Sequence, residues 1–226
     1  MSETKLPSAQ TQRRRTGAKL TKVDLRKQFK FLYSPSPKRI QLVDVPKMKF
    51  LMTDGVGDPN SRDFQSAIQT LYNLCYTIKF DLKMRRGIDY PVMALEGLWW
   101  IGDSAERFDT LQRDKWKWTL MIMQPDFVVA DQVRMAAEVA KKKGKSLENF
   151  RLEEFREGLS AQTMHVGPYS TESSDIERIR SFMNENNYVQ NGKHHEIYVG
   201  DPRRAAPSRL RTIIRQPIKS ISGSPD

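Results

Sequence analysis

Two glutamates stand in otherwise apolar segments, where a carboxyl group can be tuned for proton transfer. Glu96 interrupts the apolar run of residues 91–100, and Glu196 interrupts the segment 194–198. A carboxylate in such a run either turns to solvent at a sheet edge or enters a pocket. In a pocket, burial disfavours the charged form and raises the pKa towards the range useful for acid–base chemistry. Both glutamates are therefore candidate catalytic groups.

The segment around Glu196 contains other side chains that can take part in acid–base chemistry. Side chains alternate between the two faces of a strand, so His194, Glu196 and Tyr198 share one face. His195 and Ile197 point to the other face. The first face offers an acid–base group, an imidazole and a phenol to a single ligand. For His194, a solvated pair with its neighbour is an equally good interpretation.

The four tryptophans are confined to one region that resembles a β-hairpin. They are Trp99, Trp100, Trp116 and Trp118, and the last two share a face if the segment is a strand. Plain core packing explains any one of them. As a cluster beside carboxylates, they could also hold a flat or cationic ligand by stacking. A bulge at Gly97 would exchange the faces of Trp99 and Trp100.

Several other chemistries lack their sequence signals. The two adjacent histidines diverge on a strand, and with His165 as the remaining histidine no metal-binding spacing is present. The chain also has no Gly-x-Ser-x-Gly elbow, no Walker loop and no dinucleotide fingerprint. Cys75 falls on an apolar helical stripe, which indicates core packing. We therefore expect neither a metal nor a cofactor.

The elements that must position these residues follow from hydrophobic periodicity. An apolar i, i+3, i+4, i+7 stripe predicts a long helix over 62–80, with Ser61 or Asp63 as its N-cap. Further helices are predicted near 23–32, from 125 to 143, and over 173–186. Strands or extended segments are predicted over 40–54, 90–100, 116–123, 150–167, 193–199 and 210–218. Asp54-Gly55 is expected to form a turn.

The order strand–helix–strand–strand occurs twice, over about 40–125 and 150–218. Val56-Gly57 before the first long helix parallels Val166-Gly167 before the later one, and both halves end in Gln-Pro. Glu96 and Glu196 occupy the strand after the helix in each half. The pattern predicts an α+β fold built from a duplicated β-α-β-β unit with pseudo-two-fold symmetry and antiparallel sheets. The natural ligand site of such a fold is a central groove between the repeats.

The net charge of +11 is concentrated at the ends of the 226-residue chain. Residues 1–20 hold five Lys or Arg against one Glu and lack apolar periodicity, so we interpret them as a disordered basic arm before a domain spanning 21–220. Basicity at the ends does not indicate specific nucleic-acid recognition. One cysteine, no signal sequence and no long apolar run favour a cytoplasmic protein without membrane association.

Taken in order, the motifs resemble the stand-alone GyrI-like small-molecule-binding proteins of the SOUL/gyrase-inhibitor superfamily. The likeness spans about residues 22–219. The motifs that carry it are Leu95-Glu96-Gly97-Leu98-Trp99-Trp100, Trp116-Lys117-Trp118-Thr119, Gln124-Pro125-Asp126-Phe127, His165-Val166-Gly167-Pro168-Tyr169, Asn191 to Tyr198, and Asp201-Pro202-Arg203-Arg204.

The resemblance implies binding of bulky, flat, often cationic or drug-like compounds (xenobiotics). Part of the family resembles cyclopropanoid hydrolases, which open the strained ring of DNA-alkylating natural products inside an aromatic cage. By that analogy Glu96 and Glu196 orient the ligand or handle protons. The ligand-binding residues implied are Trp99, Trp118, Tyr76, Tyr169, Tyr198, His165 and His194.

Three functions remain open at this point. The first is a xenobiotic-binding protein that also hydrolyses a reactive ligand. The second is a pure binding or sequestration protein without turnover. The third is a protein-interaction module similar to a gyrase inhibitor. The partner expected in the first two cases is a hydrophobic or cationic aromatic small molecule, because an aromatic cage with few polar groups suits broad capture.

Overall fold

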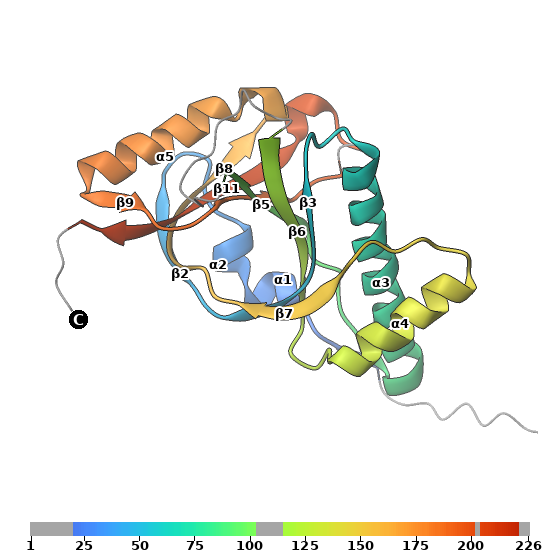
Figure 1. Cartoon of the computed structure of the whole chain (residues 1–226). Helices are drawn as coiled ribbons and strands as arrows, with labels where there is room; N and C mark the ends of the chain where they lie inside the picture. The colour runs from blue at the N-terminus through green and yellow to red at the C-terminus, as the bar shows by residue number, and fades with distance from the viewer. Residues whose placement is uncertain (1–19, 103–114, 202–203, 222–226) are drawn as a thin grey trace, which may run out of the picture.

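The structure is a computed structural model that describes residues 20–102, 115–201 and 204–221 (Figure 1). It confirms an α+β fold with an antiparallel sheet of nine strands. The helices are α1 (Leu25–Gln28), α2 (Lys30–Tyr33), α3 (Arg62–Arg86), α4 (Ala130–Lys142) and α5 (Ser173–Glu185), with 3-10 turns at Tyr169–Thr171 and Pro207–Arg209. The strands are β1 (Thr21–Lys22), β2 (Gln41–Val45), β3 (Met48–Val56), β4 (Ile88–Asp89), β5 (Leu95–Ile101), β6 (Trp116–Gln124), β7 (Arg151–Phe155), β8 (Gly158–Val166), β9 (Tyr188–Gln190), β10 (His194–Tyr198) and β11 (Arg211–Ser220).

Strand order in the large sheet is β2-β8-β11-β10-β5-β6-β3-β7, with β9 added beside β11. In each half the last strand lies between the other two: β6 between β3 and β5, and β11 between β8 and β10. The halves meet where β5 pairs with β10. This order is the one that two β-α-β-β units would produce, although the duplication itself stays a prediction.

Each end strand of this series continues along the chain into a strand near the opposite end, β2 into β3 and β7 into β8, so the sheet curls strongly. Only two residues separate β2 from β3, and only two separate β7 from β8. The pairing register is the same on both sides of these two-residue gaps, since Val45 is opposite Gly158 and Met48 is opposite Phe155. The sheet therefore has an inner, concave face and an outer face.

Different helices cover the two faces (Figure 1). On the outer face, Phe64 of α3 packs on Trp99, and Asp175 of α5 hydrogen-bonds His165 of β8. On the inner face, Tyr33 at the end of α2 reaches Glu96. Because residues directly opposite in antiparallel strands share a face, the pairing register assigns the intervening side chains to one face or the other.

Helix α3 begins at the predicted residue and runs further than predicted. Ser61 is the N-cap, and its hydroxyl accepts a hydrogen bond from the Phe64 amide. The helix continues to Arg86, where Gly87 adopts a left-handed conformation (φ 65°) and ends it. Within the described ranges, neither α3 nor any other helix combines the length and hydrophobicity that a bilayer crossing demands.

Three details of the expected strands were wrong. The strand expected over 90–100 begins only at Leu95. The segment 40–54 is divided into β2 and β3 at Pro46, and the expected turn at Asp54-Gly55 is a regular part of β3. Gly55 lies opposite Trp118, and a Cβ atom there would come within 2.1 Å of the indole ring. This glycine therefore makes room for a core tryptophan instead of forming a turn. Residues 1–19 of the predicted arm lie outside the described residues.

Candidate functional site

The carboxylate of Glu196 lies on the outer face and is held by its two alternate neighbours on β10. The Tyr198 hydroxyl donates to Oε2 at 2.8 Å, and Nε2 of His194 lies 3.1 Å from Oε1. The Glu196 side chain is 12% exposed to solvent. The same-face grouping predicted from strand alternation is therefore present, and it leaves the carboxylate partly open.

A second carboxyl group, Glu172 before α5, lies within electrostatic reach of Glu196. Burial first, and then the charge of Glu196, raise the pKa of Glu172 to about 9. The pKa of Tyr198 is raised well above its usual value, by burial and then by Glu196. At neutral pH both Glu172 and Tyr198 thus carry protons that they can donate beside the Glu196 carboxyl group.

Aromatic rings surround this group of polar side chains. Tyr169 and Tyr198 contact each other edge to face, with ring centroids 5.8 Å apart. The indole nitrogen of Trp99 donates to the Tyr198 hydroxyl at 3.2 Å. Burial raises the pKa of Tyr169 to about 12, and the charges of Glu172 and Glu196 add to the effect. Tyr169 is 42% exposed, so it offers a ring face to a ligand.

The other predicted cage residues differ in how accessible they are. Tyr76 on α3 is 46% exposed and stacks on Tyr72 and Phe80. Trp118 is 1% exposed and packs edge to face on Phe64, so its ring is part of the hydrophobic core. Any contact of Trp118 with a ligand would require the core to move.

The structure also settles which of the two adjacent tryptophans shares the face of Glu196. Gly97 pairs regularly with Glu196 and with Leu120, so β5 has no bulge at this point. Trp99 is therefore on the outer face and 2% exposed. The ring of Trp100 points the other way, and the Lys193 ammonium lies 3.4 Å from its centroid.

His165 is engaged on both sides of its ring. Its Nδ1 lies 2.8 Å from a carboxylate oxygen of Asp175, and its Nε2 lies 3.2 Å from both the Pro168 carbonyl and the Thr171 hydroxyl. These contacts tie the start of α5 to β8. The ligand contact predicted for His165 would have to replace one of them.

Glu96 lies on the inner face, on the other side of the sheet from Glu196. It is completely buried and accepts a hydrogen bond of 2.6 Å from the Tyr33 hydroxyl. Its second oxygen is 3.1 Å from Nε2 of His195, an ion-pair distance without hydrogen-bond geometry. The structure thus does not bring the two predicted carboxylates together.

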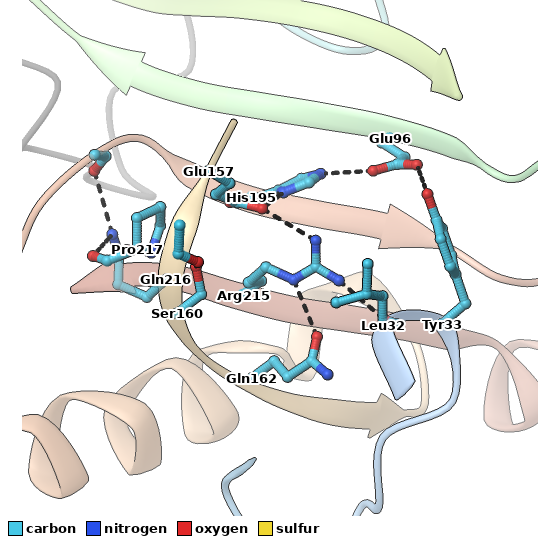
Figure 2. A network of polar contacts seen from close by, with 12 residues as sticks. Leu32, Tyr33, Glu96, Glu157, Ser160, Gln162, His195, Arg215, Gln216 and Pro217 are labelled. Atoms are coloured by element: carbon cyan, nitrogen blue, oxygen red, sulfur yellow. Dashed lines mark hydrogen bonds and ion pairs between the residues drawn. The ribbon is translucent and has the colours of Figure 1, made fainter. Parts of the chain in front are cut away.

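Figure 2 shows that Glu96 begins a chain of buried polar contacts. Nδ1 of His195 lies 2.9 Å from Glu157, whose other oxygen accepts a 3.0 Å hydrogen bond from Arg215. Arg215 also donates to the Gln162 side chain and to the Leu32 carbonyl. The side chains of Glu157, His195 and Arg215 are each 1% exposed.

The charges in this buried network balance when His195 is protonated. Burial alone would lower the pKa of His195, but the neighbouring carboxylates, Glu157 foremost, raise it above its usual value. Burial alone would raise the pKa of Glu157, but the charges of His195 and Arg215 lower it to about 2. The Glu157 carboxylate thus lies between the charges of His195 and Arg215, and such pairing is the condition for burying ions.

Sequence reasoning missed the partners that complete both clusters. Glu172 lies in a polar segment, Thr171-Glu172-Ser173-Ser174, that resembles an ordinary helix start. Gln162 and Arg215 are each followed by a second polar residue, Thr163 and Gln216, so no alternation in the sequence indicates which way they point. One signal could have identified Arg215. It precedes the Gln-Pro motif of the second half, at the position where the first half has the apolar Met123.

The curved sheet, its covering helices and the tyrosine-flanked carboxylate together define a small-molecule-binding domain. Comparison with known families agrees: the chain belongs to the GyrI-like family, whose small molecule binding domain matches residues 38–219. This confirms the resemblance inferred from the motifs. No protein with a curated description matches the chain.

Solved structures of bacterial proteins share the fold. An uncharacterized conserved protein from Listeria innocua is 40% identical, with a TM-score of 0.81 over 87% of this chain and 100% of its own. A protein from the same organism named as a hydrolase is 39% identical, with a TM-score of 0.79 over 88% of this chain and 100% of its own. A further Listeria innocua hydrolase is 38% identical, with a TM-score of 0.76 over 87% and 100%.

Proposed function

We propose that the outer face near Glu196 binds a bulky, flat, hydrophobic or cationic small molecule, and that Glu196 promotes hydrolysis of a ligand carrying a reactive cyclopropane ring. The observation that carries the proposal is the environment of Glu196: a partly exposed carboxylate oriented by Tyr198 and His194, with the exposed ring of Tyr169 packed against Tyr198. The hydrolase name of the 39% identical relative supports the catalytic half.

In the proposed reaction, the Glu196 carboxylate accepts a proton from a water molecule, and the water oxygen forms a bond to a carbon of the three-membered ring. A carbon–carbon bond of that ring breaks, and its electron pair moves into the conjugated dienone. The dienone oxygen then takes up a proton and becomes a phenol. The product is the substrate plus one water, and relief of ring strain drives the step.

The proton for the dienone oxygen is assigned to Glu172. With a pKa of about 9, this carboxyl group is still protonated at neutral pH and can donate its proton. Two carboxyl groups whose environments separate their pKa values divide the roles of acid and base between them. The Tyr198 hydroxyl holds the Glu196 carboxylate in place by donating to it.

Tyrosine rings account for the preference for flat ligands. Tyr169 and Tyr76 each leave more than two fifths of their surface exposed, and they come from α5's leading turn and from α3 respectively. Stacking between aromatic faces is tolerant of ligand shape, and a cation gains additional attraction from the ring quadrupole. The carboxylate of Glu196 favours a cation as well.

A fluorescence titration combined with mass spectrometry tests this function. The protein is titrated with a spirocyclopropyl dienone while tryptophan emission is recorded. The mass of the ligand in the same sample is then determined by mass spectrometry. A Trp100→Phe variant removes emission from the opposite face, and the ring-opened compound serves as the ligand control. Quenching together with a gain of one water by the ligand is the expected result.

The other outcomes are equally informative. Quenching with an unchanged ligand would leave a binding protein and remove the hydrolytic half of the proposal for that substrate. Absence of quenching, in both the full-length protein and the Trp100→Phe variant, would remove the binding half too. Hydrolysis that equals the protein-free rate would count as absence of turnover.

A further inference from the structure

A cleft of about 800 Å³ lies between the α1–α2 segment and β2, and none of the residues assigned to the small-molecule site lines it. Its volume is within the range of ligand-binding clefts. One wall comes from residues 39–43, and the other comes from the two short helices. The lining residues are Lys27, Gln28, Lys30, Phe31, Ser34, Arg39, Ile40, Gln41, Leu42 and Val43.

The wall formed by residues 39–43 consists of the first three residues of β2, Gln41 to Val43, and the two residues before it. Successive residues of a strand point to opposite faces, so a cleft over one face would contact alternate residues only. Here three consecutive residues of β2, Gln41 to Val43, line the cleft, which therefore runs along the backbone of the strand. Strand β2 pairs with β8 on one side, and among the described residues no strand pairs with its other side. An unpaired edge presents backbone N–H and C=O groups to an incoming chain.

The opposite wall is formed by the two short helices α1 and α2 and by Ser34, the residue that ends α2. Lys27, Lys30, Phe31 and Ser34 follow the spacing i, i+3, i+4, i+7, which places them along one side of the α1–α2 segment. Phe31 is 52% exposed, and Leu42 across the cleft is 44% exposed. The cleft thus offers two apolar contacts on facing walls.

The charge of the cleft has a single sign. Lys27, Lys30 and Arg39 are exposed and line it, and no acidic residue does. The cleft therefore favours an anionic occupant. The basic arm of residues 1–20, with five Lys or Arg against one Glu, is the wrong sign for this cleft.

We propose that the cleft is a docking site for an extended acidic segment of a partner protein, which adds to the sheet beside β2. Backbone groups of that segment pair with the free edge, its acidic side chains meet the three cations, and its apolar side chains contact Phe31 and Leu42. Addition of a strand to an exposed edge is a common mode of peptide recognition. The alternation of N–H and C=O groups along the edge matches a peptide backbone and does not match a chain of phosphates.

The test uses a fluorescein-labelled peptide in which Glu and Val alternate, added to the full-length protein. Anisotropy measures binding, and hydrogen exchange measures protection of the amides of residues 40–43. We expect binding with added protection there, and loss of binding when alternate peptide nitrogens are methylated. Charge reversal at Lys27, Lys30 and Arg39 should weaken binding at least about tenfold, since each lost charge contact is worth several tenths of a kcal/mol or more.

A matched variant separates this site from general electrostatic attraction. Lys142→Glu, Lys143→Glu and Lys145→Glu, at and beyond the end of α4, make the same charge change on exposed residues and should leave binding within about twofold. Equal weakening by both variants would overturn the proposal, as would unchanged affinity for the methylated peptide. Tighter binding of an oligonucleotide than of the peptide, lost in the cleft variant, would instead assign the cleft to nucleic acid.

Discussion

Glu96 and Glu196 lie on neighbouring strands of one sheet but point to its opposite faces. In the antiparallel pairing of β5 with β10, Glu96 is opposite Ile197, whereas Glu196 is opposite Gly97. Residues in opposite positions share a face and successive residues alternate, so this offset of one residue separates the two carboxyl groups. Glu196 contacts Tyr198, which packs on the exposed Tyr169, whereas Glu96 joins the buried network of the inner face.

The same register bears on the proposed duplication. A two-fold axis perpendicular to the sheet carries each residue to the same face, so it cannot carry Glu96 to Glu196. If the halves are related by such an axis, the counterpart of Glu196 is a direct neighbour of Glu96. The sequence pattern indicates Glu96 and Glu196 as equivalent positions of the two repeats, and under this symmetry that alignment is wrong by one residue.

The first prediction concerns the proposed base. Glu196→Gln keeps the size and hydrogen-bonding capacity of the side chain but removes its ability to accept a proton from water. Turnover of a spirocyclopropyl dienone should fall at least about 100-fold, the usual contribution of a positioned acid or base, while affinity changes little. Product formation by mass spectrometry and binding by fluorescence measure the two effects.

Glu153→Gln, on the exposed surface of β7, is the matched control and should behave as the wild type. Glu96→Gln examines the role predicted for the other carboxylate. Because the sheet separates it from Glu196, we expect the variant to lose stability and to keep its turnover per folded molecule. Turnover by Glu196→Gln equal to that of the wild type would remove Glu196 from the mechanism.

The second prediction concerns the pH dependence of stability. Glu172 binds its proton up to a pKa of about 9 in the folded protein, against an ordinary value near 4.5. Between those values the folded state holds one more proton than the unfolded state, so the free energy of unfolding falls as pH rises, by at most about 1.4 kcal/mol per pH unit. Glu172→Gln removes this loss.

Urea unfolding of both proteins between pH 4.5 and 9 makes the comparison. The stability of Glu172→Gln relative to the wild type should increase steadily with pH. The same substitution at the exposed Glu177 of α5 is the control. A constant difference between the wild type and Glu172→Gln across this range would show that Glu172 is ionised in the folded protein.

The third prediction concerns the buried network. Arg215→Met leaves Glu157 without its guanidinium partner while keeping most of the side-chain volume. Breaking a buried ion pair from one side typically costs about 3–5 kcal/mol, because the remaining charge stays buried. Arg134→Met removes an exposed pair with Asp131, which is worth less than about 1 kcal/mol. Equal losses in the two variants, measured by urea unfolding, would contradict the balance of charges described above.

The fourth prediction concerns the glycine that makes room for a tryptophan. In Gly55→Ala the new methyl group would lie 2.1 Å from the Trp118 ring, which must then move in a packed core. Overpacking of this kind costs about 1–3 kcal/mol. The control is Gly200→Ala, where the nearest atom is 4.0 Å away. If the free energy of unfolding of Gly55→Ala differs from that of the wild type by less than about 0.5 kcal/mol, the Trp118 ring moves aside without cost.

Local patterns in the sequence were sufficient to predict most elements. The stripe from Phe64 to Ile78 located α3 because helical periodicity is a property of consecutive residues. Alternation placed His194, Glu196 and Tyr198 on one face for the same reason. The end of α3 and the division of 40–54 at Pro46 were less predictable, since packing decides how far a segment stays regular.

The sequence by itself thus determined the kinds of element, their order and the polar face of β10, because each depends on neighbours a few residues apart. Only the tertiary structure decided that Glu96 turns inward, that Glu157 and Arg215 meet although 58 positions separate them, and that Glu172 comes near Glu196. These outcomes depend on the register between strands, which is set by packing across the whole core. A shift of one residue would reverse every side chain of a strand, and no local pattern encodes that choice.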